Sequence, residues 1–192
     1  MIEHSNRAAV GRRAFLAASP LLVLSTALVD ASQDGSQAAR QKPALSDELS
    51  AAEIEVVNKS KMAGDLANFF GKGHNCAESG LAVALRFLDK PPELEWIAAG
   101  FGGGAQHRDL CGFLTSGVMA LGLQAGTLKL DTKEAKAACS RSVNEYWQWW
   151  TSTAPLHCSE IREGRSDLKV CQRLGRLAAA KVEELMTAAR TT

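Results

Sequence analysis

The sequence predicts an all-α fold, a single-domain bundle of about five helices with a glycine-rich loop. Two observations predict it. Beyond residue 45, apolar residues recur at intervals of three and four, which is the spacing of one helix face. No segment alternates apolar and polar residues over the length of a strand. Helices that each carry one apolar face bury it against one another, so we expect one shared core.

The first 31 residues are expected to form a bacterial twin-arginine signal peptide rather than part of the fold. Arg12-Arg13 is followed by Phe15-Leu16 and an apolar run to Val29, and small residues at Val29 and Ala31 suit a signal peptidase. The paired arginines favour the twin-arginine route, which exports folded proteins and predicts a periplasmic location. A membrane anchor is the alternative, although a spanning helix needs roughly 20 apolar residues. We expect no membrane span after signal removal.

Residues 32–45 are expected to be a polar linker, and residues 46–190 to be one helical, cysteine-rich domain. Ser46 is the expected cap of the first helix, which the glycines of Gly71-Lys72-Gly73 end. This helix should present its apolar residues along one side toward the core.

Asn75 and Glu78 have the spacing of a capping box and predict the start of a second helix. Pro91-Pro92 stops that helix, and a short helix over 93–99 follows it. The next feature is the loop Gly102-Gly103-Gly104, where backbone can approach a ligand closely or form an anion-binding concavity.

Three further main helices are expected over about 110–123, 132–153 and 167–189, and their expected caps are Asp109, Asp131 or Thr132, and Ser166. Cys158 opens a short turn or helix before the last of them. The third helix is rich in glycine, which is less favourable than alanine by about 1 kcal/mol per residue in a helix. We therefore expect close packing against it, either by its own core or by a second copy of the chain in a homodimer.

The charge balance excludes two classes of partner. The chain has 22 basic and 21 acidic residues, and the first 31 residues contain three arginines and two acids, so the remainder is formally neutral. Nucleic acid and anionic membranes both require a basic excess. We therefore expect no nucleic-acid partner.

Five cysteines in an exported chain leave at least one thiol outside any disulfide, unless a metal binds it. The chain contains no Cys-x-x-Cys. This absence rules out a covalent haem site, a thioredoxin-type motif and a compact zinc knuckle.

Four cysteines are the candidate cofactor ligands: Cys76, Cys111, Cys158 and Cys171. The first three are expected at helix starts, where unpaired N–H groups stabilise a thiolate or hydrogen-bond to cluster sulfides. Cys171 is expected about two turns into the last helix. Cys139, flanked by alanines, is expected to be a small buried apolar residue.

Each histidine beyond the signal lies near a cysteine: His74, His107 and His157. They are either metal ligands and proton carriers or exposed loop residues. No serine near a histidine has the strand–turn–helix context of a hydrolase. The chain is therefore interpreted as an electron carrier or redox protein rather than a hydrolase or transferase.

The chain resembles the redox-active C_GCAxxG_C_C proteins. The matching segments are 75–80, with Cys76 in a Cys-Ala-x-x-Gly element, and 98–122, with the glycine loop and Cys111-Gly112. Cys158 and Cys171 match the two later single cysteines, Asn75 replaces a glycine or cysteine of many members, and Cys139 is additional. The resemblance implies redox activity through these cysteines, suited to an iron–sulfur cluster.

Three functions remain open at this point. The first is an exported protein for electron transfer or redox sensing, in which four thiolates hold a two-iron or four-iron cluster. The second is a metal-free dithiol/disulfide protein, with Cys158 and Cys171 as a pair. The third is a helical module with a structural zinc site.

Overall fold

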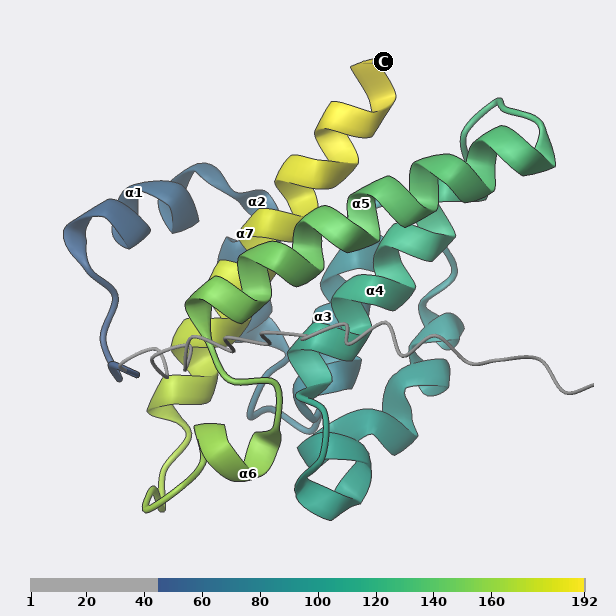
Figure 1. The fold of residues 1–192 in the computed structure, drawn as a ribbon. Helices are drawn as coiled ribbons and strands as arrows, with labels where there is room; N and C mark the ends of the chain where they lie inside the picture. The colour runs from purple at the N-terminus through teal and green to yellow at the C-terminus, as the bar shows by residue number, and fades with distance from the viewer. Residues whose placement is uncertain (1–44, 192) are drawn as a thin grey trace, which may run out of the picture. The chain divides into compact units, whose positions relative to one another are not determined.

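The computed structural model describes residues 45–191. The expected signal peptide and nearly all of the expected linker lie outside these residues. Within the described part the chain is helical and contains no strand, which confirms the all-α prediction, although the helices are more numerous than five (Figure 1). No helix in this range is long and apolar enough to span a membrane.

The first predicted helix is divided in two. α1 (Ala51–Lys59) is capped by Ser50 through a capping box with Glu53, so the prediction that Ser46 caps it was wrong. The chain is extended at Ser60, which caps α2 (Lys61–Asp65). The helix breaks there because the Ser60 hydroxyl accepts from the Ala63 N–H and donates to Glu183 at 2.6 Å. A short turn, η1 (Leu66–Asn68), follows α2.

The second helix begins where the sequence predicts. α3 (Cys76–Phe87) is capped by Asn75, and Glu78 completes the capping box. The expected short helix is the 3-10 segment η2 (Pro92–Phe101). The wide turn η3 (Gly104–Arg108) then returns the chain toward α4 through several residues with positive φ.

α4 (Gly112–Ala125) begins two residues later than expected, with Cys111 as its N-cap. The prediction that Asp109 caps this helix was wrong, because the Asp109 carboxylate instead contacts His157 Nδ1 at 2.8 Å. α5 (Thr132–Thr153) is capped by Asp131 in a capping box with Glu134.

The short helix opened by Cys158 is α6 (Cys158–Ile161), and the last helix is α7 (Lys169–Thr191). Ser166 does not cap α7, because the helix starts three residues further on. The Lys169 N–H donates a hydrogen bond to the Asp167 carboxylate instead. Cys171 therefore lies in the first turn of α7 rather than two turns into it.

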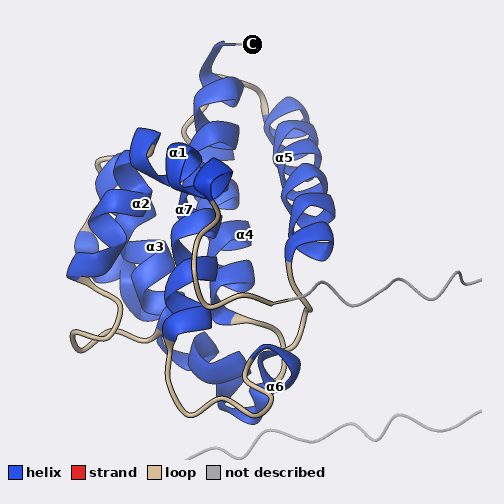
Figure 2. Cartoon of the chain, turned by 90° about the vertical axis from the view of Figure 1, so that its left-hand side faces the viewer, coloured by secondary structure: helices blue, strands red, loops and turns tan. Residues whose placement is uncertain are grey.

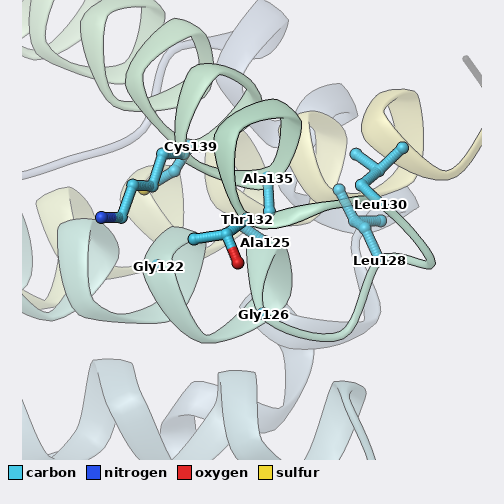
Figure 3. A pocket seen from close by; sticks show the side chains of 9 residues that line it. Gly122, Ala125, Gly126, Leu128, Leu130, Thr132, Ala135 and Cys139 are labelled. Atoms are coloured by element: carbon cyan, nitrogen blue, oxygen red, sulfur yellow. The ribbon is translucent and has the colours of Figure 1, made fainter.

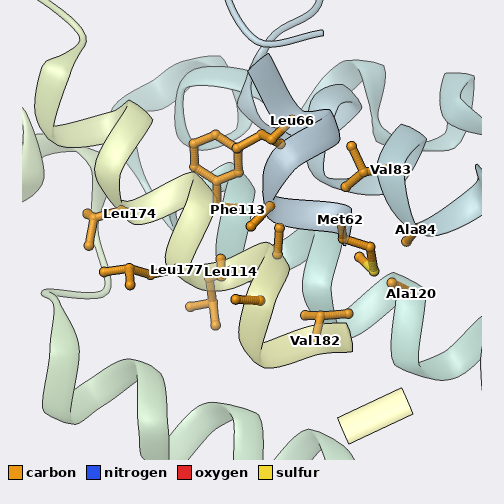
Figure 4. Packing of buried hydrophobic residues seen from close by; sticks show 14 of the residues in the cluster. Met62, Leu66, Val83, Ala84, Phe113, Leu114, Ala120, Leu174, Leu177 and Val182 are labelled. Carbon is orange, nitrogen blue, oxygen red and sulfur yellow. The ribbon is translucent and has the colours of Figure 1, made fainter. Parts of the chain in front are cut away.

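α4 packs against α3, α5 and α7, and α7 also contacts α2 (Figure 2). Phe113 and Leu114 at the start of α4 are buried among side chains of α2, α3 and α7 (Figure 4). Glycine permits the closest contacts. A Cβ at Gly175 would lie 2.5 Å from Phe113 Cζ, and one at Gly117 would lie 2.4 Å from Tyr146 Cε1. The expected close neighbour of α4 is thus found within its own core.

Candidate functional site

The four candidate cysteines lie at the N-termini of four different helices. Cys76 is the first residue of α3, Cys111 is the N-cap of α4, Cys158 is the first residue of α6, and Cys171 is the third residue of α7. The first turn of a helix presents unpaired N–H groups and a partial positive charge. At α3 the N–H groups of Ala77 and Glu78 already donate to the Asn75 side chain, so at Cys76 only the partial charge of the helix end favours a thiolate.

Two of these helix starts are joined by a short antiparallel contact. Leu110 and His157 form an isolated β-bridge. On one side the Cys111 N–H donates to the Leu156 carbonyl at 2.9 Å, and on the other the Cys158 N–H donates to the Asp109 carbonyl at 2.7 Å. These hydrogen bonds hold Cys111 and Cys158 in neighbouring segments, although 46 residues separate them in the sequence.

The segment that carries Cys158 is anchored from α5. The indole N–H of Trp150 donates to the Pro155 carbonyl at 3.0 Å, and both the indole and Pro155 are buried. The buried Tyr146 hydroxyl donates to the Phe113 carbonyl at 3.0 Å, close to Cys111. α5 thus positions the starts of both α4 and α6.

Cys76 lies directly against the start of α4. A Cβ at Gly112 would be 2.4 Å from Cys76 Sγ and 2.9 Å from the Ala77 nitrogen. Only glycine allows the α3 and α4 N-termini to approach so closely. The glycine that follows Cys111 in the sequence therefore makes room for the sulfur of another candidate ligand.

Negative charge on Cys76 acts on each of the other three candidate cysteines. Burial raises the pKa of Cys111, and repulsion from Cys76 raises it further. Burial and then Cys76 raise the pKa of Cys158. Burial raises the pKa of Cys171 to about 11, with added repulsion from Cys76 and Cys158. The Phe113 and Leu114 N–H groups act to lower the pKa of Cys111, although neither forms a capping hydrogen bond and burial outweighs them.

All five cysteines are free thiols. Among residues 45–191, no three histidine, cysteine, aspartate or glutamate side chains are placed as a group that could hold a metal ion.

Arg162 is a member of the site that sequence reasoning missed. It follows Cys158 by one turn of helix. Its positive charge acts to lower the pKa of Cys158 and Cys171 and so opposes the larger, raising effect of burial. Its Nη2 is 3.5 Å from the carbonyls of Arg165 and Ser166, while its Nε is buried without a hydrogen-bond partner. The available signal was a basic residue four positions after a candidate ligand on a short predicted helix.

The glycine loop packs against the residues next to the cysteines. A Cβ at Gly102 would lie 2.4 Å from Asn75 Cγ, and Asn75 Nδ2 donates to the Ala99 carbonyl at 3.1 Å. Gly103 has φ of 61°, and a Cβ at Gly104 would lie 2.4 Å from the Asp109 carbonyl oxygen. The loop thereby fixes Asn75, which caps the helix that begins with Cys76.

Two of the three histidines pair with carboxylates. His74 Nε2 lies 3.4 Å from Glu95 Oε2, and its Nδ1 is buried without a hydrogen-bond partner among the described residues. His157 Nδ1 lies 2.8 Å from Asp109 Oδ1. His107 is exposed within η3.

Cys139 lies elsewhere on the molecule. It lines a pocket of about 370 Å³ with Gly122, Ala125 and Leu130 (Figure 3). Gly122 is eleven residues along α4 from Cys111, which is about 16 Å at the helical rise of 1.5 Å per residue. The half-buried Cys139 is thus placed apart from the other four cysteines.

Comparison with protein families gives one match. The model of the family described as "Putative redox-active protein (C_GCAxxG_C_C)" matches residues 74–185, more than half of the chain. The matched range contains all four candidate cysteines, the glycine loop and Arg162. Neither the comparison with curated proteins nor the comparison with solved structures gave a match.

Proposed function

Since the chain belongs to the redox-active C_GCAxxG_C_C family, we propose that Cys76, Cys111, Cys158 and Cys171 form one centre that binds an iron–sulfur cluster. The protein would transfer or sense electrons through this centre. The observation that carries the proposal is the contact of Cys76 Sγ with the start of α4 at Gly112, together with the bridge that holds Cys111 and Cys158 in neighbouring segments.

The residues present fit such a group. Four thiols are the donor set of two-iron and four-iron clusters, and helix-end N–H groups suit their sulfides. The absence of a side chain at Gly112 leaves the room that Cys76 Sγ occupies beside the start of α4. The buried Nε of Arg162, which lacks a partner, offers a donor beside Cys158 and Cys171.

A bound cluster would supply one-electron transfer. The chain's own part is to supply four thiolates, exclude water and offset negative charge. Because burial keeps the pKa of Cys111 and Cys171 above the ordinary thiol value, loading must release protons from these thiols. Arg162 stabilises the negative charge that remains.

Export in a folded, loaded state is part of the same proposal. The Arg12-Arg13 pair and the apolar run behind it support the twin-arginine route to the periplasm. The neutral charge of the remaining chain fits a protein redox partner better than nucleic acid or membrane. This activity is that of an electron carrier and not of a hydrolase or transferase.

A second candidate is a dithiol that cycles with a disulfide. It is favoured by one observation: Cys158 and Cys171 are both free thiols, and charge on Cys158 acts to raise the pKa of Cys171. Their bond would close a 14-residue loop and contribute about 3 kcal/mol in the chain-entropy model.

One experiment separates the two. The protein is expressed without air, and its absorption spectrum is recorded with its iron, sulfide, zinc and free-thiol content. Iron with acid-labile sulfide and broad thiolate-to-iron absorption would support the cluster. A colourless protein with fewer than five free thiols would support the disulfide, and stoichiometric zinc would contradict both.

A further inference from the structure

Residues 45–53, which include the first turn of α1, are tied at two places, once to the loop before α7 and once to α7 itself. Near the start of this segment, Arg165 donates from Nη2 to the Leu45 carbonyl at 3.2 Å and from Nε to Asp47 at 3.3 Å. Near its end, Glu53 of α1 is bound by two nitrogens of Arg173, one of them at 3.3 Å. α1 and this segment lie along one side of α7 (Figure 1).

A cavity of about 820 Å³ lies between the two ties. This volume is within the range of small-molecule sites. One part of the lining is apolar and comes from the tied segment, α1 and the region of η1: Leu49, Ile54, Leu66 and Phe70. Ile54 is 44% exposed, so an apolar ligand chain could cover it and remove its surface from water.

The other part of the lining is cationic. It contains Lys72, Lys169, Arg173 and Arg176 against two acids, Asp47 and Glu48. Asp47 is already bound to Arg165. Among the described residues, Lys72 and Arg176 take part in no salt bridge within 4.0 Å.

Arg173 provides the most specific feature of this cavity. Its side chain is 11% exposed, and Nε and Nη2 are engaged by Glu53. Its Nη1 is buried and has no hydrogen-bond partner. A buried guanidinium with a spare donor is costly unless an acceptor satisfies it. An anionic oxygen in the cavity would be such an acceptor.

We propose that this cavity binds an amphipathic carboxylate, with an alkyl chain on Leu49, Ile54 and Phe70 and its head between Arg173 and Arg176. A guanidinium suits a carboxylate because its planar donors match two oxygens. The site is independent of the sulfur centre. With 3.6 residues per turn, the lining residues of α7 share one face, and Cys171 projects from the opposite side.

The test uses the full chain and decanoate, titrated calorimetrically below the concentration at which decanoate forms micelles. Decanoate is expected to bind one molecule per chain, and more weakly as salt is raised. Butyrate, which lacks the chain, and decanol, which lacks the charge, should each bind at least about tenfold more weakly.

Matched variants locate the site. Arg176→Gln should weaken decanoate binding about tenfold, since it removes a charged donor. Lys133→Gln removes an equal charge from exposed α5 and should leave binding unchanged. Ile54→Ser should also weaken binding, whereas Val56→Ser, at a residue of α1 that is 51% exposed and outside the lining, should not.

Failure to bind decanoate in the full chain would overturn the proposal. Equal effects of Arg176→Gln and Lys133→Gln, or of the two serine substitutions, would also overturn it, because binding would then be non-specific. Unchanged thermal unfolding of the four variants shows that each is folded. Iron and thiol content do not enter this test, so its result is separate from that for the sulfur centre.

Discussion

The sulfur of Cys76 lies in the space that a side chain at Gly112 would occupy, since a Cβ there would be 2.4 Å from Sγ. Gly112 directly follows Cys111, so the chain places a small residue where two candidate ligands approach each other. This contact joins the starts of α3 and α4, and it makes the site sensitive to a single methyl group.

Gly112→Ala should therefore displace Cys76 and prevent loading of the centre. Overpacking of this kind costs about 1–3 kcal/mol of folding free energy. Gly122→Ala is the matched control on the same helix, because a Cβ at Gly122 meets nothing within 4 Å. It should be neutral or stabilise the helix by up to about 1 kcal/mol. Iron and sulfide content and urea unfolding of both variants measure the difference. Equal cluster loading and equal unfolding free energies in the two variants would contradict the packing inferred for Cys76.

Serine at any one of Cys76, Cys111, Cys158 or Cys171 should abolish cluster loading, because a hydroxyl is a poor ligand for iron in a cluster of this kind. Cys139→Ser should load normally, since Cys139 lines a pocket at the other end of α4. Iron and sulfide are measured in all five variants after anaerobic purification. Similar loading in all five would rule out one shared centre.

The metal-free protein should lose stability at alkaline pH. Burial raises the pKa of Cys171 from 9.0 to about 11 in the folded state. A thiol with a raised folded-state pKa is more readily ionised when unfolded, so its stabilising contribution is complete below pH 9 and is lost as pH rises toward 11. The free energy of unfolding in urea should fall over this interval.

Cys171→Ala provides the comparison for this pH dependence. Its unfolding free energy should fall less steeply between pH 9 and 11, because the variant has one fewer buried thiol to ionise. Parallel curves for the two proteins would show that Cys171 is not the group responsible.

Arg162→Gln should lower the reduction potential of the loaded protein, because an anionic centre is harder to reduce once a nearby positive charge is removed. A shift of the order of tens of millivolts is expected. Arg162→Lys should retain part of the effect, since it keeps the charge and loses the planar donors. Arg141→Gln, on exposed α5, serves as the charge-matched control. A potential unchanged by Arg162→Gln would show that this guanidinium does not face the centre.

The sequence was most informative where the signal is local. Asn75 with Glu78 predicts the start of α3 correctly, and Asp131, one of the two expected caps, begins α5, because each cap satisfies N–H groups of its own helix. Ser50 with Glu53 is a box of the same type, and Ser50 rather than Ser46 caps α1. The residues that begin each of these three helices therefore lie within one helical turn of one another.

The sequence was less informative where a distant residue decides the structure. Asp109 has the chemistry of a cap, yet it is bound by His157, 48 residues away. The bridge between Leu110 and His157, which joins two ligand segments, leaves no periodic pattern in either segment. The contribution of Arg162 likewise depends on how α6 turns into α7. The sequence nominates the four cysteines as one set, whereas the contacts that join Cys76, Cys111 and Cys158 come from residues distant in the chain.

Trp150→Phe tests whether α5 holds the Cys158 segment in place. The indole N–H donates to the Pro155 carbonyl at 3.0 Å, and phenylalanine would leave that buried carbonyl without its donor. The lost hydrogen bond and the unfilled space together should cost about 2–4 kcal/mol of folding free energy.

The effect of Trp150→Phe should be local as well as global, because Pro155 leads directly into the bridge beside Cys111. Amide hydrogen exchange at Cys111 and Cys158, whose N–H groups donate across that bridge, should speed up more than exchange within α3. Tyr146→Phe is the comparison, because it removes a buried donor from the same helix whose acceptor is the Phe113 carbonyl of α4. It should destabilise the start of α4 without this preferential effect on Cys158. A uniform acceleration in both variants would mean that Trp150 contributes to stability alone and does not position the candidate ligand.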